Sequence, residues 1–144
     1  MATANAKVTI TAAADPRWGD AVDNSQQLTV AYGTIAVDAN PATYATGGVA
    51  LVNASNTSLG AWNQEPIKSA PPAGKTSPQP VWVDIADVSG TGYVYTWNKA
   101  NNKLQIWTSN GAAPNALLEF TNATAIPAAV SGGTLYVRAV FYRV

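Results

Sequence analysis

The chain has 144 residues, of which 47% are hydrophobic and 11% are charged; its formal net charge is zero, and it contains neither cysteine nor histidine. These absences exclude disulfides, a Ser-His-Asp triad and histidine- or cysteine-ligated metal sites within the chain. The cationic residues are scattered, which argues against a nucleic-acid partner, and no apolar run approaches the roughly 20 residues of a membrane span. A surface this poor in charge suits close contact with neighbouring protein chains.

The first predicted element is a strand at residues 7–12, because Val8 and Ile10 alternate with threonines. We expect this strand at a sheet edge, preceded by a free arm of about residues 1–6 that reaches a neighbouring chain. The start of the chain has no apolar segment typical of a secretory signal, so we expect synthesis in a cytoplasm.

Residues 13–26 predict a loop, because aspartate, asparagine, proline and glycine cluster around Trp18. Three carboxylates and an asparagine here have the chemistry of calcium ligands, but their spacing does not match an EF-hand loop. We interpret them as turn-forming residues and predict no metal site and no cofactor.

Residues 27–38 predict a longer strand whose apolar residues fall out of phase on either side of Gly33. A β-bulge at Gly33 would bring all five to one face, because a bulge adds one residue to a strand. The five are Leu28, Val30, Tyr32, Ile35 and Val37.

Residues 49–52 predict a short strand after a glycine pair, and residues 53–60 a polar loop. The next segment, about residues 61–80, contains five prolines, which exclude an interior strand. We interpret it as an exposed contact loop with Trp62 as an anchor. The alternative, Trp62 packed back on the sheet, is equally compatible with the sequence.

The second half of the chain alternates more regularly. A strand at residues 81–89 leads to a hairpin at residues 92–107, in which Tyr93, Tyr95 and Trp97 share one face before an asparagine-rich turn. In the returning strand Leu104 and Ile106 point one way, and Lys103, Gln105 and Trp107 the other.

A short strand at 116–120 precedes a final strand at 134–144, both of whose faces are substantially apolar. One face carries Leu135, Val137, Ala139 and Phe141, and the other Tyr136, Arg138, Val140 and Tyr142. Such a strand is central, or a partner chain covers it. No amphipathic helix is predicted.

Short strands separated by turn signals predict an all-β protein. We expect a single domain spanning residues 1–144, an antiparallel β-sandwich of jelly-roll type, with barrel closure as the alternative.

Three segments together resemble the small decoration or cement proteins of tailed-bacteriophage heads. They are Tyr-Ala-Thr-Gly-Gly-Val-Ala-Leu at residues 44–51, the hairpin at 92–107 that opens Gly-Tyr-Val-Tyr-Thr-Trp, and Leu-Tyr-Val-Arg-Ala-Val at 135–140. The resemblance covers residues 44–144. It includes neither the proline-rich loop nor the N-terminal arm.

This resemblance implies a virion structural protein on the outer capsid surface, commonly a homotrimer that clamps neighbouring subunits of the major capsid protein. Contacts with the shell are then expected from the arm, the Trp18 loop, the proline-rich loop and the final strand. The candidate contact residues are Trp18, Trp62, Ile67, Lys68, Lys75, Tyr136, Arg138 and Tyr142.

A carbohydrate-binding module is the main alternative, in which an exposed row of Trp18, Trp62 and Trp107 would stack on sugars. A head-fibre base or tail component is another. An enzyme is not predicted, because the eight carboxylates lie mostly in turn-like contexts and no histidine or cysteine is present.

Overall fold

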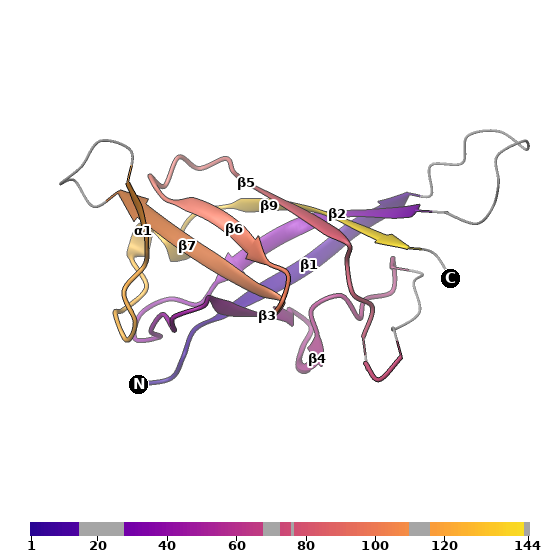
Figure 1. The fold of residues 1–144 in the computed structure, drawn as a ribbon, viewed down its shortest axis with the longest axis horizontal. Helices are drawn as coiled ribbons and strands as arrows, with labels where there is room; N and C mark the ends of the chain where they lie inside the picture. Colours follow the sequence, from indigo (N-terminus) through magenta and orange to yellow (C-terminus); the bar gives the residue numbers. More distant parts are fainter. Residues whose placement is uncertain (15–27, 68–72, 76, 110–115, 143–144) are drawn as a thin grey trace, which may run out of the picture.

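The computed structural model describes residues 1–14, 28–67, 73–75, 77–109 and 116–142, and this part of the chain is nearly all β-structure (Figure 1). The all-β fold class expected from the sequence is confirmed at this level. In chain order the elements are β1 (Asn5–Ala14), β2 (Leu28–Val37), β3 (Val49–Asn53), β4 (Asn56–Gly60), β5 (Trp82–Asp87), β6 (Val94–Asn98), β7 (Lys103–Ser109), β8 (Leu117–Glu119), α1 (Ala128–Ser131) and β9 (Leu135–Tyr142).

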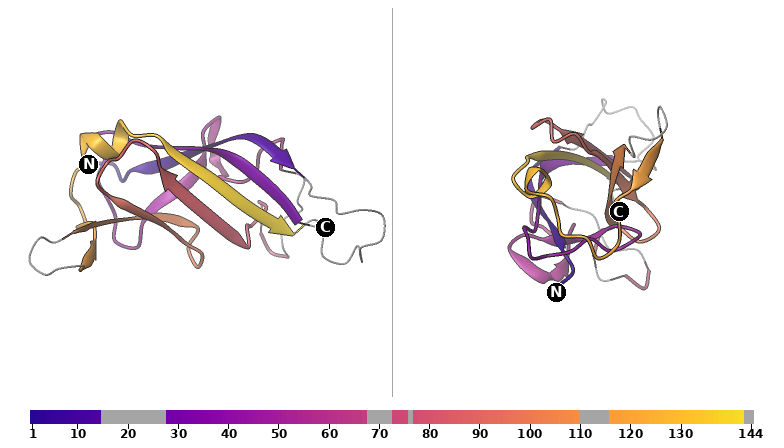
Figure 2. Two further views of the ribbon diagram at one scale, coloured as in Figure 1. Left: turned by 90° about the horizontal axis from the view of Figure 1, so that it is seen from above. Right: turned by 90° about the vertical axis from the view of Figure 1, so that its left-hand side faces the viewer.

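The strands form one mixed sheet in the order β5-β9-β2-β1-β3-β7-β6, with β4 beside β3 and β8 beside β7. Neighbours pair antiparallel except for β1 and β3, which run parallel. The sheet curls until its two end strands, β5 and β6, lie near each other, and the end-on view in Figure 2 shows the resulting near-barrel.

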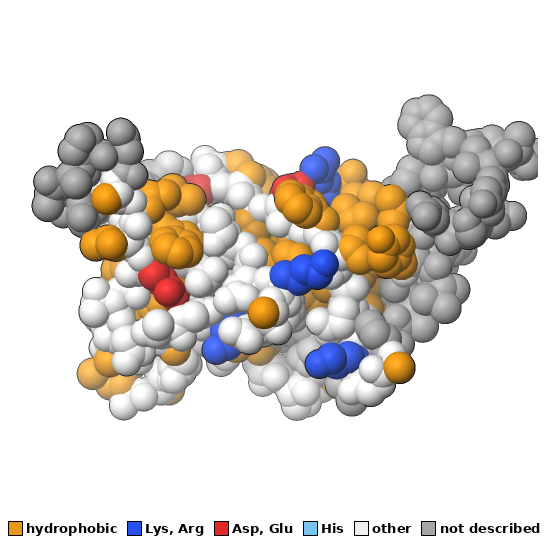
Figure 3. All heavy atoms as spheres, viewed as in Figure 1, with side chains coloured by type: hydrophobic (Ala, Val, Ile, Leu, Met, Phe, Trp, Pro, Cys, Tyr) orange, Lys and Arg blue, Asp and Glu red, His pale blue; other side chains and the backbone are white. Residues whose placement is uncertain are grey.

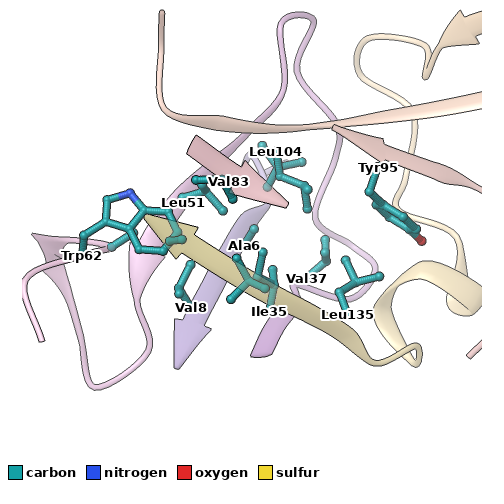
Figure 4. Packing of buried hydrophobic residues seen from close by; sticks show 14 of the residues in the cluster. Ala6, Val8, Ile35, Val37, Leu51, Trp62, Val83, Tyr95, Leu104 and Leu135 are labelled. Carbon is teal, nitrogen blue, oxygen red and sulfur yellow. The ribbon is translucent and has the colours of Figure 1, made fainter. Parts of the chain in front are cut away.

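The hydrophobic core lies inside this curl (Figure 4), where side chains from strands far apart in the sequence meet. Burial of this apolar surface is the main driving force for the fold. Its labelled members are Ala6, Val8, Ile35, Val37, Leu51, Trp62, Val83, Tyr95, Leu104 and Leu135, all buried.

The strand at the start of the chain is interior, so the edge position expected for it is wrong: β1 pairs with β2 on one side and with β3 on the other. Residues 2–6 are not a free arm either. Ala4 N–H donates to the Thr43 carbonyl at 2.8 Å, and Thr43 N–H donates to the Ala2 carbonyl at 3.1 Å. Ala4 and Ala6 are fully buried, because small side chains let the chain continue into the core.

The bulge expected at Gly33 is also wrong. β2 keeps an unbroken alternation, and the extra residue is Thr11 of β1, which lies between the pairs Ile10–Gly33 and Ala12–Tyr32. The inward face of β2 therefore holds Ile35 and Val37 together with Thr29, Ala31 and Gly33, and all five are buried. Leu28 and Tyr32, which were predicted to share a face with Ile35 and Val37, are exposed.

Gly33 is required by the close approach of β1. A Cβ atom at this position would lie 2.0 Å from the Thr9 carbonyl oxygen, a backbone atom that cannot rotate away. We expect Gly33→Ala to lower the free energy of unfolding by about 3 kcal/mol, the upper part of the range for overpacked interiors, as measured by urea denaturation. Thr34→Ala, one residue along β2, is the matched control and should change stability by less than about 1 kcal/mol. Equal losses of unfolding free energy in the two variants would contradict a specific requirement for glycine at position 33.

The predicted hairpin is confirmed as β6 and β7, which pair antiparallel, with Leu104 and Ile106 fully buried. Asn102 in its turn has a φ of 51°, the left-handed conformation for which asparagine was expected. The Asn102 side chain also links the turn to the core. Its Oδ1 accepts hydrogen bonds from the indole N–H groups of Trp62 at 2.9 Å and Trp97 at 3.0 Å.

The described part of residues 61–80 contains no strand, as the prolines predicted, but it packs closely on the sheet. Trp62 is fully buried, and its ring meets that of Phe141 edge-on with 5.8 Å between centroids. The packed-back alternative for Trp62 is therefore confirmed, and its role as an exposed anchor is wrong. Residues 53–60, expected to be a loop, include β4, whose polar side chains are mostly exposed beside β3.

The strands expected at residues 81–89, 116–120 and 134–144 correspond to β5, β8 and β9. β9 lies between β5 and β2, so its central position is confirmed. Its buried positions are those expected: Leu135, Val137, Ala139 and Phe141. α1 is a single turn of four residues, and within the described ranges no helix is long and apolar enough to cross a membrane.

Candidate functional site

The outward face of β5, β9 and β2 gathers exposed aromatic side chains. In β9 these come from positions that alternate with the buried ones, and the strand register extends the face on both sides. Arg138 lies opposite Asp84 of β5 and Tyr32 of β2, and Tyr142 lies opposite Leu28. Directly paired residues point to the same face of a sheet, so these side chains form one continuous surface.

We call this surface the outer aromatic face. Its residues are Leu28, Tyr32, Trp82, Tyr136, Arg138 and Tyr142. The exposed fractions are 60% for Trp82, 58% for Tyr142, 52% for Tyr136, 46% for Tyr32 and 37% for Leu28. Figure 2 shows β5, β9 and β2 side by side in the view from above, and in Figure 3 hydrophobic side chains gather near the carboxyl end of β9.

A hydrogen-bonded group fixes the centre of this face. Trp82 donates its indole N–H to Asp84 Oδ1 at 2.7 Å, and Arg138 donates Nε–H to Asp84 Oδ2 at 2.9 Å and a second bond from Nη2 to the same oxygen. The hydrogen bond from Trp82, followed by the bonds and charge of Arg138, lowers the pKa of the Asp84 carboxyl below its ordinary value. The Trp82 side chain is thus held in one orientation although it is exposed.

The ionised Asp84 carboxylate should hold this group together in a pH-dependent way. Because the folded state lowers the pKa, the stabilisation is complete above the ordinary value of 3.8 and is lost as pH falls through the folded value. Carboxyl-detected NMR titration should give an Asp84 pKa below 3.8. In Arg138→Ala the pKa should rise but remain lowered, because Trp82 still donates. An unchanged pKa in Arg138→Ala would show that the guanidinium does not act on this carboxyl.

The structure brings together three of the eight candidate contact residues, Tyr136, Arg138 and Tyr142, on the outer aromatic face. Ile67 and Trp62 are buried in the core cluster, so neither presents a surface to another chain. Lys75 is exposed but lies in the segment before β5, apart from the others in sequence. Two candidates, Trp18 and Lys68, lie outside the described residues. So do the carboxylates that the sequence places in the 13–26 loop.

Sequence reasoning missed Trp82, Tyr32 and Leu28. A signal for Trp82 was present, because it alternates with Val81 and Val83 and so had to face away from the core. Tyr32 and Leu28 were expected to share one face with Ile35 and Val37, which are buried, so their exposure was not predicted.

The other carboxylates with described hydrogen bonds serve the fold. Asp38 pairs with Lys7 at 3.1 Å, and Asp87 accepts the N–H and hydroxyl of Thr91 at 2.8 and 2.6 Å. Glu119 accepts the Tyr44 hydroxyl at 2.7 Å, and burial, followed by this bond, raises the pKa of that hydroxyl. Within the described residues no three acidic side chains are grouped in a way that could hold a metal ion.

Comparison with known proteins gives no relative: no family model matches the chain, and neither curated proteins nor solved structures include a significant match. The outer aromatic face therefore remains the candidate site. Its exposed groups are aromatic rings around one charge pair.

Proposed function

We propose that this chain is a structural protein of a virion, a cement or decoration protein that binds the outer surface of a tailed-phage capsid and stabilises contacts between major capsid subunits. In this proposal the outer aromatic face is the attachment surface, and the protein has no enzymatic role. The observation that carries the proposal is the set of ordered, half-exposed aromatic residues around the Asp84–Arg138 pair.

The residue types on this face are those that dominate protein interfaces. Tryptophan, tyrosine and arginine are enriched among residues whose truncation costs more than about 2 kcal/mol of binding free energy. They project from paired strands, two of them central, so their backbones are already ordered before binding. Less conformational entropy is then lost on association than for a loop.

Binding to an assembled shell would stabilise that shell by linkage, because binding lowers the free energy only of the state that the protein binds. The resemblance of residues 44–51, 92–107 and 135–140 to phage decoration proteins supports this role. It also suggests a homotrimer, in which several modest contacts act together. We extend the proposal to the fold: the curled sheet would correspond to a jelly-roll-like sandwich, with β9 and β2 in one layer and β7 and β6 in the other.

The test is co-sedimentation of the purified protein with mature heads of the parent phage that lack it, together with the solution mass by light scattering. Saturable binding that raises the temperature of head disruption would support the proposal. Heads that neither bind the protein nor gain stability would remove it. A solution mass equal to that of a monomer would contradict the homotrimer but not the attachment to heads.

A carbohydrate-binding role is the second candidate, because exposed aromatic rings also stack on sugars. The predicted row of Trp18, Trp62 and Trp107 does not form as expected, since Trp62 is buried. The outer aromatic face with Trp82 would have to replace it. Glycan-array binding that is lost in Trp82→Ala, with no binding to heads, would favour this role over the capsid role.

A further inference from the structure

The curled sheet has an open seam where its two end strands face each other. Among the described residues, β5 pairs with β9 alone and β6 pairs with β7 alone, so in this part of the chain each has one edge without a partner strand. The described residues show no backbone hydrogen bond between β5 and β6. Side chains close one end: Asp87 accepts from Thr91, whose hydroxyl also bonds the Tyr95 hydroxyl at 2.8 Å.

Away from that closed end the seam is a groove of about 500 Å³. Ile85 shares a strand face with buried Val83, and Trp97 shares one with buried Tyr95, yet both are only half-buried. The core therefore reaches solvent through this gap. The groove is lined by the run 81–85, which includes Trp82, Asp84 and Ile85, and on the other side by residues of β6 and its turn, among them Trp97 and Lys99.

We propose that this seam accepts an extended segment of the partner protein as an added β-strand. This inference rests on the proposed function, and names how the partner is held. Unpaired strand edges present rows of N–H and C=O groups that an extended peptide satisfies, while pockets select its alternate side chains. A run of consecutive β5 residues lines the groove, so at about 3.3 Å per residue the inserted strand is about five residues long.

The lining specifies the chemistry of that strand. An apolar side chain on its inward face would pack between Ile85 and Trp97 and complete the core. Asp84 is already neutralised by Arg138, whereas Lys99 has no ion-pair partner among the described residues. An acidic side chain near one end of the strand would complement Lys99. The indole N–H of Trp82 already donates to Asp84 and is not available to a ligand. The hydrogen-bonding groups that the seam offers are therefore the backbone N–H and C=O groups of the strand edges. A peptide backbone matches such a row of groups better than a sugar does.

The probe is a synthetic peptide of about seven residues, threonine throughout except for valine at the second and fourth positions and aspartate at the sixth. Binding is followed by amide NMR of the whole protein. We expect shifts and exchange protection at β5 and β6. Methylation of the peptide's alternate amide nitrogens should weaken binding at least about tenfold, because it removes the ladder donors.

Lys99 allows a charge-swap test that should leave the fold intact, because this side chain is exposed. Lys99→Glu should weaken the aspartate peptide and strengthen its lysine counterpart, each about two- to fivefold, as for a surface ion pair. No binding at millimolar peptide, shifts away from β5 and β6, or indifference to amide methylation would overturn the inference. So would protection of the same amides by a second copy of the chain or by a glycan.

The two proposals fail in different ways. If the protein binds the peptide in the seam but does not bind heads, the capsid role is contradicted and the seam site is supported. If the wild type and Lys99→Glu bind heads equally and neither binds the peptide, the capsid role is supported and the seam site is contradicted.

Discussion

Replacing Trp62 by alanine is expected to lower the free energy of unfolding by about 3–5 kcal/mol. The side chain is fully buried, packs edge-on against Phe141 and donates its indole N–H to Asn102. Its removal leaves a cavity and takes one of two donors from the Asn102 side chain. Domains of this size have a total stability of about 5–15 kcal/mol, so the loss should be plain in urea or guanidinium denaturation.

Two control variants separate the causes of this loss. Trp82→Ala removes the same side chain from an exposed site and should cost less than about 1 kcal/mol. Trp62→Phe retains a smaller ring without the N–H group, so its loss combines the bond to Asn102, about 1 kcal/mol, with part of the lost packing and should lie below that of Trp62→Ala. If Trp62→Ala and Trp82→Ala were equally mild, the segment after β4 would not be part of the core.

The sequence was most informative where the residues that form the buried face of a strand recur at every second position. In β7, Leu104 and Ile106 alternate with Lys103 and Gln105, so period two located this strand. In β9 both faces are largely apolar, but the inward series from Leu135 to Phe141 still recurs at every second position. Asn102 likewise marked its turn, because few residues tolerate a φ of 51°.

The error in β2 has a functional meaning. The pattern was interpreted by placing the five larger apolar residues on one face, which required a bulge at Gly33. The bulge belongs to the partner strand β1 instead, and Leu28 and Tyr32 point outward beside β9. A strand whose outer face is as apolar as its inner face departs from the usual pattern, and such departures are expected where a surface serves binding.

Long-range pairing could not be predicted in the same way. Nothing in residues 1–6 shows that they join the sheet, because the parallel partner β3 lies more than forty positions along the chain. The burial of Trp62 depends on Asn102 and Phe141, which are equally remote. Proline content excluded a ladder in this segment but did not indicate which side of the sheet the tryptophan would cover.

Truncating two tyrosines of the outer aromatic face should greatly weaken attachment to phage heads while leaving the fold stable. Tyr32 lies opposite Arg138, and Tyr136 lies two residues before it on the same face; both side chains are about half exposed. If they act as central interface residues, each change to alanine costs about 2 kcal/mol of binding free energy, or about thirtyfold in Kd. The double variant should then bind several-hundredfold more weakly in co-sedimentation.

Leu117→Ala with Val94→Ala is the matched control, because these side chains are comparably exposed but belong to β8 and β6. Neither tyrosine lines the seam, so the double tyrosine variant should still bind the synthetic peptide. Urea denaturation should place both double variants within about 1 kcal/mol of the wild type. Attachment that survives loss of both tyrosines, or that falls equally in the control, would place the contact surface elsewhere on the molecule. Loss of attachment in the tyrosine variant alone would place the contact surface on the face that β2 and β9 share. The exposed aromatic side chains of this face are not needed to hold the sheet together, so binding would account for their presence.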